Sequence, residues 1–303
     1  MPNRSPLALA ALATVAVKGL QPVGAQAVTG TDDEMDVAVV HDDVQRRWLV
    51  RSPRTSSAAA RLEQECRVLE PLEGLLPFAV PHVAGQVALP EGGVAVVSRV
   101  LEGTPLDPAG LTHGPGLAAG LGRALAAVHD LPERVVEEAG LPVYGAEEHR
   151  QRRLAEVDRA AASGHVPARL LARWEKALEE AGAWRFVPCV VHGDLAAESV
   201  LVQHHDVVGM LEWGEARVAD PADDLAWIAV AAPEDALESV VEAYAHTRRS
   251  APDRDLARRA RLSGELAVAR WLLHGVTTDD AAVVDDAVAM LAELDRAVAD
   301  RPW

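Results

Sequence analysis

The sequence predicts a two-lobed α+β fold in which a small, strand-rich lobe (residues 1–101) precedes a larger, mainly helical lobe (residues 102–303). The first observation is a set of short valine-rich runs separated by polar turns, which are typical of strands: Val37–Val40, Trp48–Val50 and Val94–Val100. The second is the break at Leu101–Pro105, beyond which long stretches rich in Ala, Leu, Arg and Glu indicate helices.

The composition is that of an ordinary globular protein. The chain has 303 residues, of which 49% are apolar and 25% are charged. Its 29 basic and 46 acidic residues give a net charge of −17, which argues against a nucleic-acid partner and favours a cationic one. The two cysteines, Cys66 and Cys189, lack metal-site spacing, and we expect both to be core thiols in a reducing compartment.

The N-terminal segment resembles a secretory signal, because the apolar run Leu7–Val17 precedes the small-residue triplet Ala25–Ala27. Lys18 interrupts that pattern, and Ser5-Pro6 is typical of a helix start, with Gly19 as the expected end. We therefore expect a short amphipathic helix. No run reaches the roughly 20 apolar residues of a membrane span, so we expect a cytoplasmic protein without a membrane partner.

The remaining elements follow in order. A helix is expected at residues 57–72, between the valine-rich runs. The second lobe is expected to contain helices at residues 117–129, 147–163, 168–182, 222–230, 235–248, 256–274 and 280–299. An extended segment at residues 187–211 interrupts these helices, and it carries the acidic motifs.

The motifs of this segment are two short strands flanked by two acidic loops. His192-Gly193-Asp194 ends the first apolar run, and Glu212-Trp213-Gly214 follows the last one. Such a hairpin places one carboxylate at each strand end, so that one could orient a hydroxyl while the other holds a metal. The tripeptide alone could equally be a tight turn, and only its spacing to the second loop makes it informative.

With that spacing, the segment resembles the aminoglycoside and macrolide phosphotransferases, which are distant relatives of protein kinases. Their pattern runs H-G-D-x-x-x-x-N, a hairpin, then D-W-G or D-F-G, and here Asp194, Ser199 and Glu212 occupy those positions. The run Trp213–Asp220 is most similar to the macrolide 2′-phosphotransferases. The resemblance extends over nearly the whole chain and implies a protein-kinase-like fold.

The resemblance implies a role for each of these residues. Asp194 would accept a hydrogen bond from the substrate hydroxyl and aim it at the transferring phosphate. Ser199 and Glu212 would hold Mg²⁺, although the family usually has Asn and Asp there. Both substitutions change the reach of a metal ligand, and magnesium tolerates little departure from octahedral geometry. A catalytically impaired, pseudokinase-like binding protein is therefore one alternative.

The first lobe would bind the nucleotide. Arg51 would hold its phosphates, with Glu65 as ionic partner and Glu63 as the second candidate for that role. The alternative for Glu65 is a solvated helix charge. The purine of ATP or GTP would contact backbone groups at Ser98, Arg99 and Val100. The only candidate phosphate loop, Val28–Asp33, is acidic and poorly suited to phosphate.

Two further residues of the motif region have expected structural roles. His192 is expected to brace its loop rather than to react. The resemblance implies that Asp224 ties this loop to the helix beneath it; the alternative is an acid near a helix start that favours the helix dipole.

The acceptor is expected to be a cationic small molecule, and we favour a macrolide with a monomeric enzyme. An aminoglycoside or another metabolite is the alternative acceptor. Six apolar residues of the second lobe could form the wall of a macrolide pocket, or simply belong to its core: Trp227, Tyr244, Trp271, Leu272, Met290 and Leu291.

Overall fold

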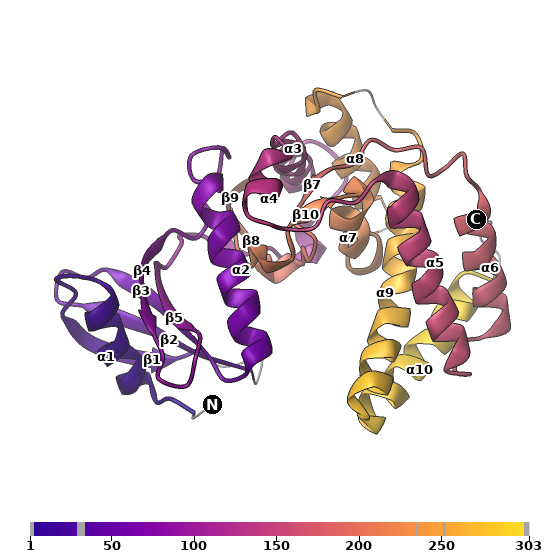
Figure 1. The fold of residues 1–303 in the computed structure, drawn as a ribbon. Coiled ribbons are helices and arrows are strands. Elements are labelled where there is room, and N and C mark those ends of the chain that lie inside the picture. The colour runs from indigo at the N-terminus through magenta and orange to yellow at the C-terminus, as the bar shows by residue number, and fades with distance from the viewer. Residues whose placement is uncertain (1–2, 29–33, 234, 251–252, 300–302) are drawn as a thin grey trace. The chain divides into compact units, whose positions relative to one another are not determined.

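The computed structural model describes residues 3–28, 34–233, 235–250, 253–299 and 303, and the chain divides into two compact units (Figure 1). The first unit comprises Met1–Leu106, Arg134–Leu141 and Glu198–Ala216. The second comprises Asp107–Glu133, Pro142–Ala197 and Arg217–Trp303. The first unit thus contains the hairpin of Ser199 and Glu212, while Asp194 belongs to the second.

A five-stranded antiparallel sheet forms the centre of the first unit. Its strand order is β1-β2-β3-β5-β4. The bounds are β1 Pro22–Ala27, β2 Met35–Asp42, β3 Arg47–Pro53, β4 Val83–Ala88 and β5 Val94–Arg99. The alternating burial along β2 and β3 follows the two-residue period of a strand, so one face of each strand enters the core.

Helix α1 (Pro6–Ala16) covers one face of this sheet, and Figure 1 shows α2 (Ser56–Leu72) on the other. Ser5 is the N-cap of α1, since its side chain accepts a hydrogen bond from the Ala8 amide. Leu9 and Ala13 pack against Val40 and Val97 of the sheet. The expected N-terminal helix is confirmed, although it ends at Ala16, before Gly19.

The same unit contains a small three-stranded sheet, in the order β6-β8-β9. Its strands are β6 Thr104–Pro105, β8 Val200–Gln203 and β9 Asp206–Met210, and the single turns η2 (Ala197–Ser199) and η3 (Trp213–Glu215) flank the β8–β9 hairpin. Helix α4 (Arg134–Glu138) also belongs here. The hairpin pairs Val200 with Met210, and Leu211 donates its N–H to the Ser199 carbonyl oxygen at 2.9 Å. This register brings the residues beyond each strand end together.

The second unit is mainly helical. Its helices are α3 Leu117–His129, α5 Ala146–Ala162, α6 Ala168–Glu179, α7 Ala226–Ala231, α8 Ala236–Thr247, α9 Leu256–Thr278 and α10 Ala281–Ala297, with short turns η1 Pro108–Gly110 and η4 Pro221–Leu225. Strands β7 (Cys189–Val191) and β10 (Arg217–Ala219) pair antiparallel. Helices α5, α6, α9 and α10 surround one core that contains the fully buried Trp174 (Figure 1).

The predicted α+β class is confirmed, and every expected helix has a counterpart. Strands β1 and β4 and the short helix α4 escaped prediction, because their residues lack a sustained apolar period. None of the described helices combines the length and the hydrophobicity that crossing a membrane requires. Both cysteines are free thiols, and burial raises the pKa of Cys66 to about 11. Cys189 is buried, whereas Cys66 is only partly so.

Candidate active site

Arg51 and Glu65 form an ion pair in the first unit. The Arg51 Nη1 atom donates to Glu65 Oε2 at 2.6 Å. Arg51 lies on β3 and Glu65 on α2, and their side chains are 14% and 6% exposed. The pairing is therefore the one that the sequence predicted, and Glu65 is not a solvated helix charge.

The pair keeps unused hydrogen-bonding capacity. Burial alone would lower the pKa of the Arg51 guanidinium, but Glu65 outweighs it and the pKa is raised, with a further contribution from Glu212. Among the described residues, Arg51 Nε and Glu65 Oε1 are buried without a hydrogen-bond partner. A guanidinium that is permanently charged and incompletely satisfied is suited to binding an oxyanion.

Ser199 and Glu212 contact each other at the end of the β8–β9 hairpin. The buried Ser199 hydroxyl donates to Glu212 Oε2 at 2.7 Å, while the Glu212 side chain is exposed. Glu212 has φ 64° and ψ 50°, the left-handed region that a non-glycine residue adopts rarely. Such strain is common at functional sites.

The donor chemistry of this pair fits magnesium. A carboxylate and a hydroxyl are hard oxygen ligands, and protein magnesium sites commonly use one or two carboxylates together with substrate phosphates. Among the residues that the structure describes, no three His, Cys, Asp or Glu side chains are grouped as a metal site. Glu212 and Ser199 therefore offer at most part of a metal coordination sphere within the described residues.

The three expected purine-binding residues lie at the end of β5. Ser98 is buried, and the Val100 N–H already donates to the Arg47 carbonyl oxygen at 3.1 Å. The guanidinium of Arg99 lies 4.2 Å from the ring centre of Trp48. The Val100 amide and the Arg99 side chain are therefore engaged within the sheet. Residues 29–33 of the candidate phosphate loop lie outside the described part of the chain.

In the second unit, the Asp194 loop (residues 192–196) is bound by the buried carboxylate of Asp224. The amides of His192 and Gly193 donate to its two oxygens at 2.7 and 2.8 Å, and His129 Nε2 lies 3.0 Å from Oδ2. Burial would raise the pKa of Asp224, but these hydrogen bonds, led by that of His129, hold it below its usual value. Asp224 thus ties the loop to the end of α3, as the resemblance implies.

Asp194 itself is exposed, while His192 is completely buried. The loop therefore presents one carboxylate to solvent and uses its histidine internally, which agrees with a bracing role for His192. The sequence reasoning missed His129, the last residue of α3. A histidine at the C-terminal end of a helix is ordinary in sequence, so only the fold shows that it contacts Asp224.

Only some of the six residues suggested for a macrolide pocket are exposed to solvent. Tyr244, Leu272 and Leu291 are buried, and Tyr244 donates to or accepts from His129 Nδ1 at 2.9 Å. These three are buried, which agrees with the alternative that they belong to the core. Trp271 and Met290 are 39% and 40% exposed, so they remain accessible to a ligand.

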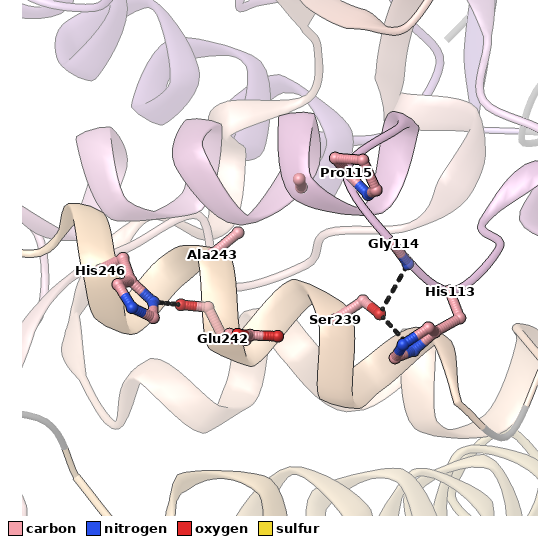
Figure 2. Close-up of a pocket in the computed structure, with 8 residues that line it drawn as sticks. His113, Gly114, Pro115, Ser239, Glu242, Ala243 and His246 are labelled. Carbon is pink, nitrogen blue, oxygen red and sulfur yellow. Dashed lines mark hydrogen bonds between the residues drawn. The ribbon is translucent and has the colours of Figure 1, made fainter.

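A surface cavity of about 330 Å³ lies between the start of α3 and α8 (Figure 2). His113 Nδ1 and the Ser239 hydroxyl lie 3.0 Å apart, and the Gly114 amide donates to the same hydroxyl. His246 binds the Glu242 carbonyl oxygen of its own helix. None of the residues that line this cavity is an expected site residue, so we assign it no part in the chemistry.

Comparison with known proteins identifies the family. The model of the phosphotransferase enzyme family, APH, matches residues 30–262. This chain belongs to that family. The predicted relationship to aminoglycoside and macrolide phosphotransferases is therefore confirmed, and the protein is a phosphotransferase.

Three known proteins show how far the similarity extends. Macrolide 2′-phosphotransferase MphH from Brachybacterium faecium is 26% identical, with a TM-score of 0.79 over 90% of this chain and 94% of its own. The GDP complex of aminoglycoside 2′-phosphotransferase-IIIa is 18% identical, with a TM-score of 0.80 over 96% of this chain and 98% of its own, and it supports the kinase-like fold alone. Viomycin phosphotransferase of Streptomyces vinaceus is 33% identical over 207 residues, which are 62% of this chain and 69% of that protein.

Asp224→Asn should destabilise the protein by about 2–4 kcal/mol at pH 7, because it removes a charged acceptor from three buried partners. The pKa of Asp224 is lower in the folded protein than in the unfolded chain. Its contribution to the free energy of unfolding is therefore complete above the unfolded pKa of about 3.9, and it is lost as the pH falls through the folded pKa. Urea unfolding of both proteins from pH 7 to pH 3 should therefore show curves that converge in acid. The exposed Asp158→Asn is the control, expected within about 0.5 kcal/mol of wild type. A difference that stays constant down to pH 3 contradicts the role given to Asp224.

Proposed function

We propose that this phosphotransferase moves the terminal phosphate of GTP or ATP to the 2′-hydroxyl of a macrolide amino sugar. The observation that carries the proposal is the exposed Asp194 carboxylate on a loop whose backbone is bound to a buried, charged Asp224. A carboxylate in this setting can accept the proton of an acceptor hydroxyl and orient the oxygen. Rigid attachment matters because catalysis depends on alignment.

The nucleotide phosphates are assigned to Arg51, with Glu65 holding the guanidinium. The 2.6 Å ion pair sets the direction of the arginine side chain, and Nε lies buried without a partner among the described residues. Glu65 would otherwise be a buried charge without compensation, so each member of the pair requires the other. Backbone groups at the end of β5, around Ser98, Arg99 and Val100, remain the proposed location of the purine.

Magnesium is assigned to Glu212 and Ser199, whose oxygens are already 2.7 Å apart. The ion would neutralise charge on the transferring phosphate when bound. This chain contributes the carboxylate on an exposed, left-handed residue and the hydroxyl that fixes its orientation.

The acceptor is proposed to be cationic because the net charge is −17. A macrolide combines an amine with a large apolar ring, and the exposed Trp271 and Met290 of the second unit provide apolar surface. The 26% identity to a macrolide 2′-phosphotransferase over nearly the full chain supports this choice. The 33% identity to viomycin phosphotransferase supports viomycin as a second candidate acceptor.

A direct assay decides between these acceptors. The purified protein is incubated with magnesium, GTP or ATP, and a panel of macrolides, aminoglycosides and viomycin, and the products are examined by mass spectrometry. The proposal expects a phosphate mass increment on macrolides and none on the others. If only viomycin or aminoglycosides gain a phosphate, the proposed macrolide acceptor is wrong and that class of compound takes its place. If no compound gains a phosphate, the result supports a binding protein without transferase activity.

Asp194→Ala should reduce turnover by at least about 10²-fold, because general-base groups commonly contribute 10² to 10⁴. Nucleotide binding, followed by thermal shift, should stay within about twofold, since Asp194 contacts the acceptor and not the phosphates in this proposal. Asp158→Ala, at another exposed aspartate of the same unit, is the matched control and should retain turnover. A loss within tenfold for Asp194→Ala contradicts its assigned role.

Glu65→Gln should weaken nucleotide binding by about tenfold or more, because the Arg51 guanidinium loses the charge that directs it. Glu63 lies on the same helix two residues away and is exposed, so Glu63→Gln is the matched control, expected to leave the Kd unchanged. The measurement is isothermal titration with GTP and ATP in the presence of magnesium. Equal affinities for the two variants would remove Arg51 and Glu65 from the nucleotide site.

A further inference from the structure

The peptide group that joins Gly193 to Asp194 accepts a hydrogen bond from Arg217. Arg217 Nη2 donates to the Gly193 carbonyl oxygen at 3.1 Å, while the Gly193 amide donates to Asp224 Oδ1 at 2.8 Å. Gly193 has φ 89°, a conformation that residues with a Cβ adopt rarely. The backbone of this residue is thus fixed at both its N–H and its C=O.

Arg217 is itself fixed by Asp223, the neighbour of Asp224 in sequence. The same Nη2 atom donates its second hydrogen to Asp223 Oδ2 at 3.1 Å. Arg153 Nη2 and the Ser263 hydroxyl donate to Asp223 Oδ1 at 2.8 and 3.0 Å. The Asp223 side chain is 4% exposed, so a buried carboxylate with three donors determines where Nη2 can lie.

The charge state of this cluster does not vary at ordinary pH. Burial would raise the pKa of Asp223, but Arg153, then His149 and Arg217, hold it far below its usual value. His149 lies 3.8 Å from Asp223, and burial lowers its pKa. Arg270 also faces the cluster, and burial together with the like charge of Arg153 lowers its pKa. Asp223 is therefore ionised at ordinary pH, and its ion pair with Arg217 does not depend on pH.

The position of a carbonyl oxygen defines the plane of its peptide group, and hence the direction in which the following Cα begins. Fixing the Gly193 oxygen therefore restricts the direction from which the Asp194 side chain leaves the loop. We infer that Arg217 is a positioning residue for Asp194, held by Asp223 and acting through the Gly193 carbonyl group. This inference rests on the proposed function for the step that Asp194 performs, and it adds a residue that touches neither phosphate nor acceptor.

Arg217→Met tests the inference by kinetics. The side chain keeps most of its length and loses both hydrogen bonds, so kcat should fall about 100-fold, as expected when a reacting group is misplaced by about 1 Å. The nucleotide KM should stay within about threefold, because the nucleotide is assigned to other residues. Arg217→Lys keeps a cation with several donors, so its kcat should be at least tenfold higher than that of Arg217→Met.

The matched control is Arg173→Met, which removes another arginine of similar exposure from the same unit. The Arg173 side chain is 14% exposed against 17% for Arg217, and it binds Glu265 rather than the Asp194 loop. Its loss should lower thermal stability comparably and leave kcat within about threefold. If the two methionine variants lose kcat equally, or if Arg217→Met leaves kcat unchanged, Arg217 is only structural and the inference is wrong.

Amide hydrogen exchange provides a readout that does not depend on turnover. Peptides covering residues 192–196 should exchange at least tenfold faster in Arg217→Met than in wild type, and at the wild-type rate in Arg173→Met. If no acceptor is phosphorylated but this difference appears, the proposed function fails and the loop contact stands. Unchanged exchange overturns the contact itself. Should Arg217→Met fail to fold, Arg217→Gln, which is neutral and shorter than arginine, undergoes both measurements, and wild-type kcat and exchange in that variant overturn the inference.

Discussion

The burial of two consecutive charged aspartates determines which elements of the second unit must pack together. Asp223 and Asp224 lie in the segment leading into α7, and each contacts groups from other elements. Asp223 accepts hydrogen bonds from Arg153, Arg217 and Ser263. Asp224 contacts His129 and accepts hydrogen bonds from two loop amides. A buried carboxylate without such partners would be strongly unfavourable, so the elements that provide them must assemble around this dipeptide. Helices α3, α5 and α9 and strand β10 are thereby tied to the loop that bears Asp194.

The groups of the first unit that we assign to ligands are arranged differently. Its Arg51–Glu65 pair is buried but keeps one unpartnered polar atom on each side chain among the described residues. Its Ser199–Glu212 pair joins a buried hydroxyl to an exposed carboxylate. The contrast lies in the carboxylates: Asp223 and Asp224 of the second unit use both of their oxygens as acceptors, whereas Glu65 of the first unit keeps one buried oxygen without a partner.

Much of this arrangement was predictable from local pattern. Spacing along the chain placed Asp194, Ser199 and Glu212 on one hairpin region, and the resemblance paired Arg51 with Glu65 and tied Asp224 to the loop. The Ser199–Glu212 hydrogen bond was not predictable, because it depends on a hairpin register that joins residues 13 positions apart. Arg217 was missed for the same reason, since β10 must pair with β7, with Arg217 opposite Val191, before its side chain can reach Gly193. The burial of Leu272 and Leu291 depends on which faces α9 and α10 turn toward each other, and apolar composition alone does not decide that.

The central proposal is that Asp194 orients the acceptor hydroxyl and that Glu212 with Ser199 binds the metal. A crystal structure with a non-hydrolysable GTP or ATP analogue, magnesium and a macrolide tests it most directly. The account predicts a metal ion bound to Glu212 and to the analogue's phosphates, with the macrolide 2′-hydroxyl within about 2.6–3.2 Å of the Asp194 carboxylate. A metal that contacts neither Glu212 nor Ser199, or a macrolide whose 2′-hydroxyl lies away from Asp194, would contradict it.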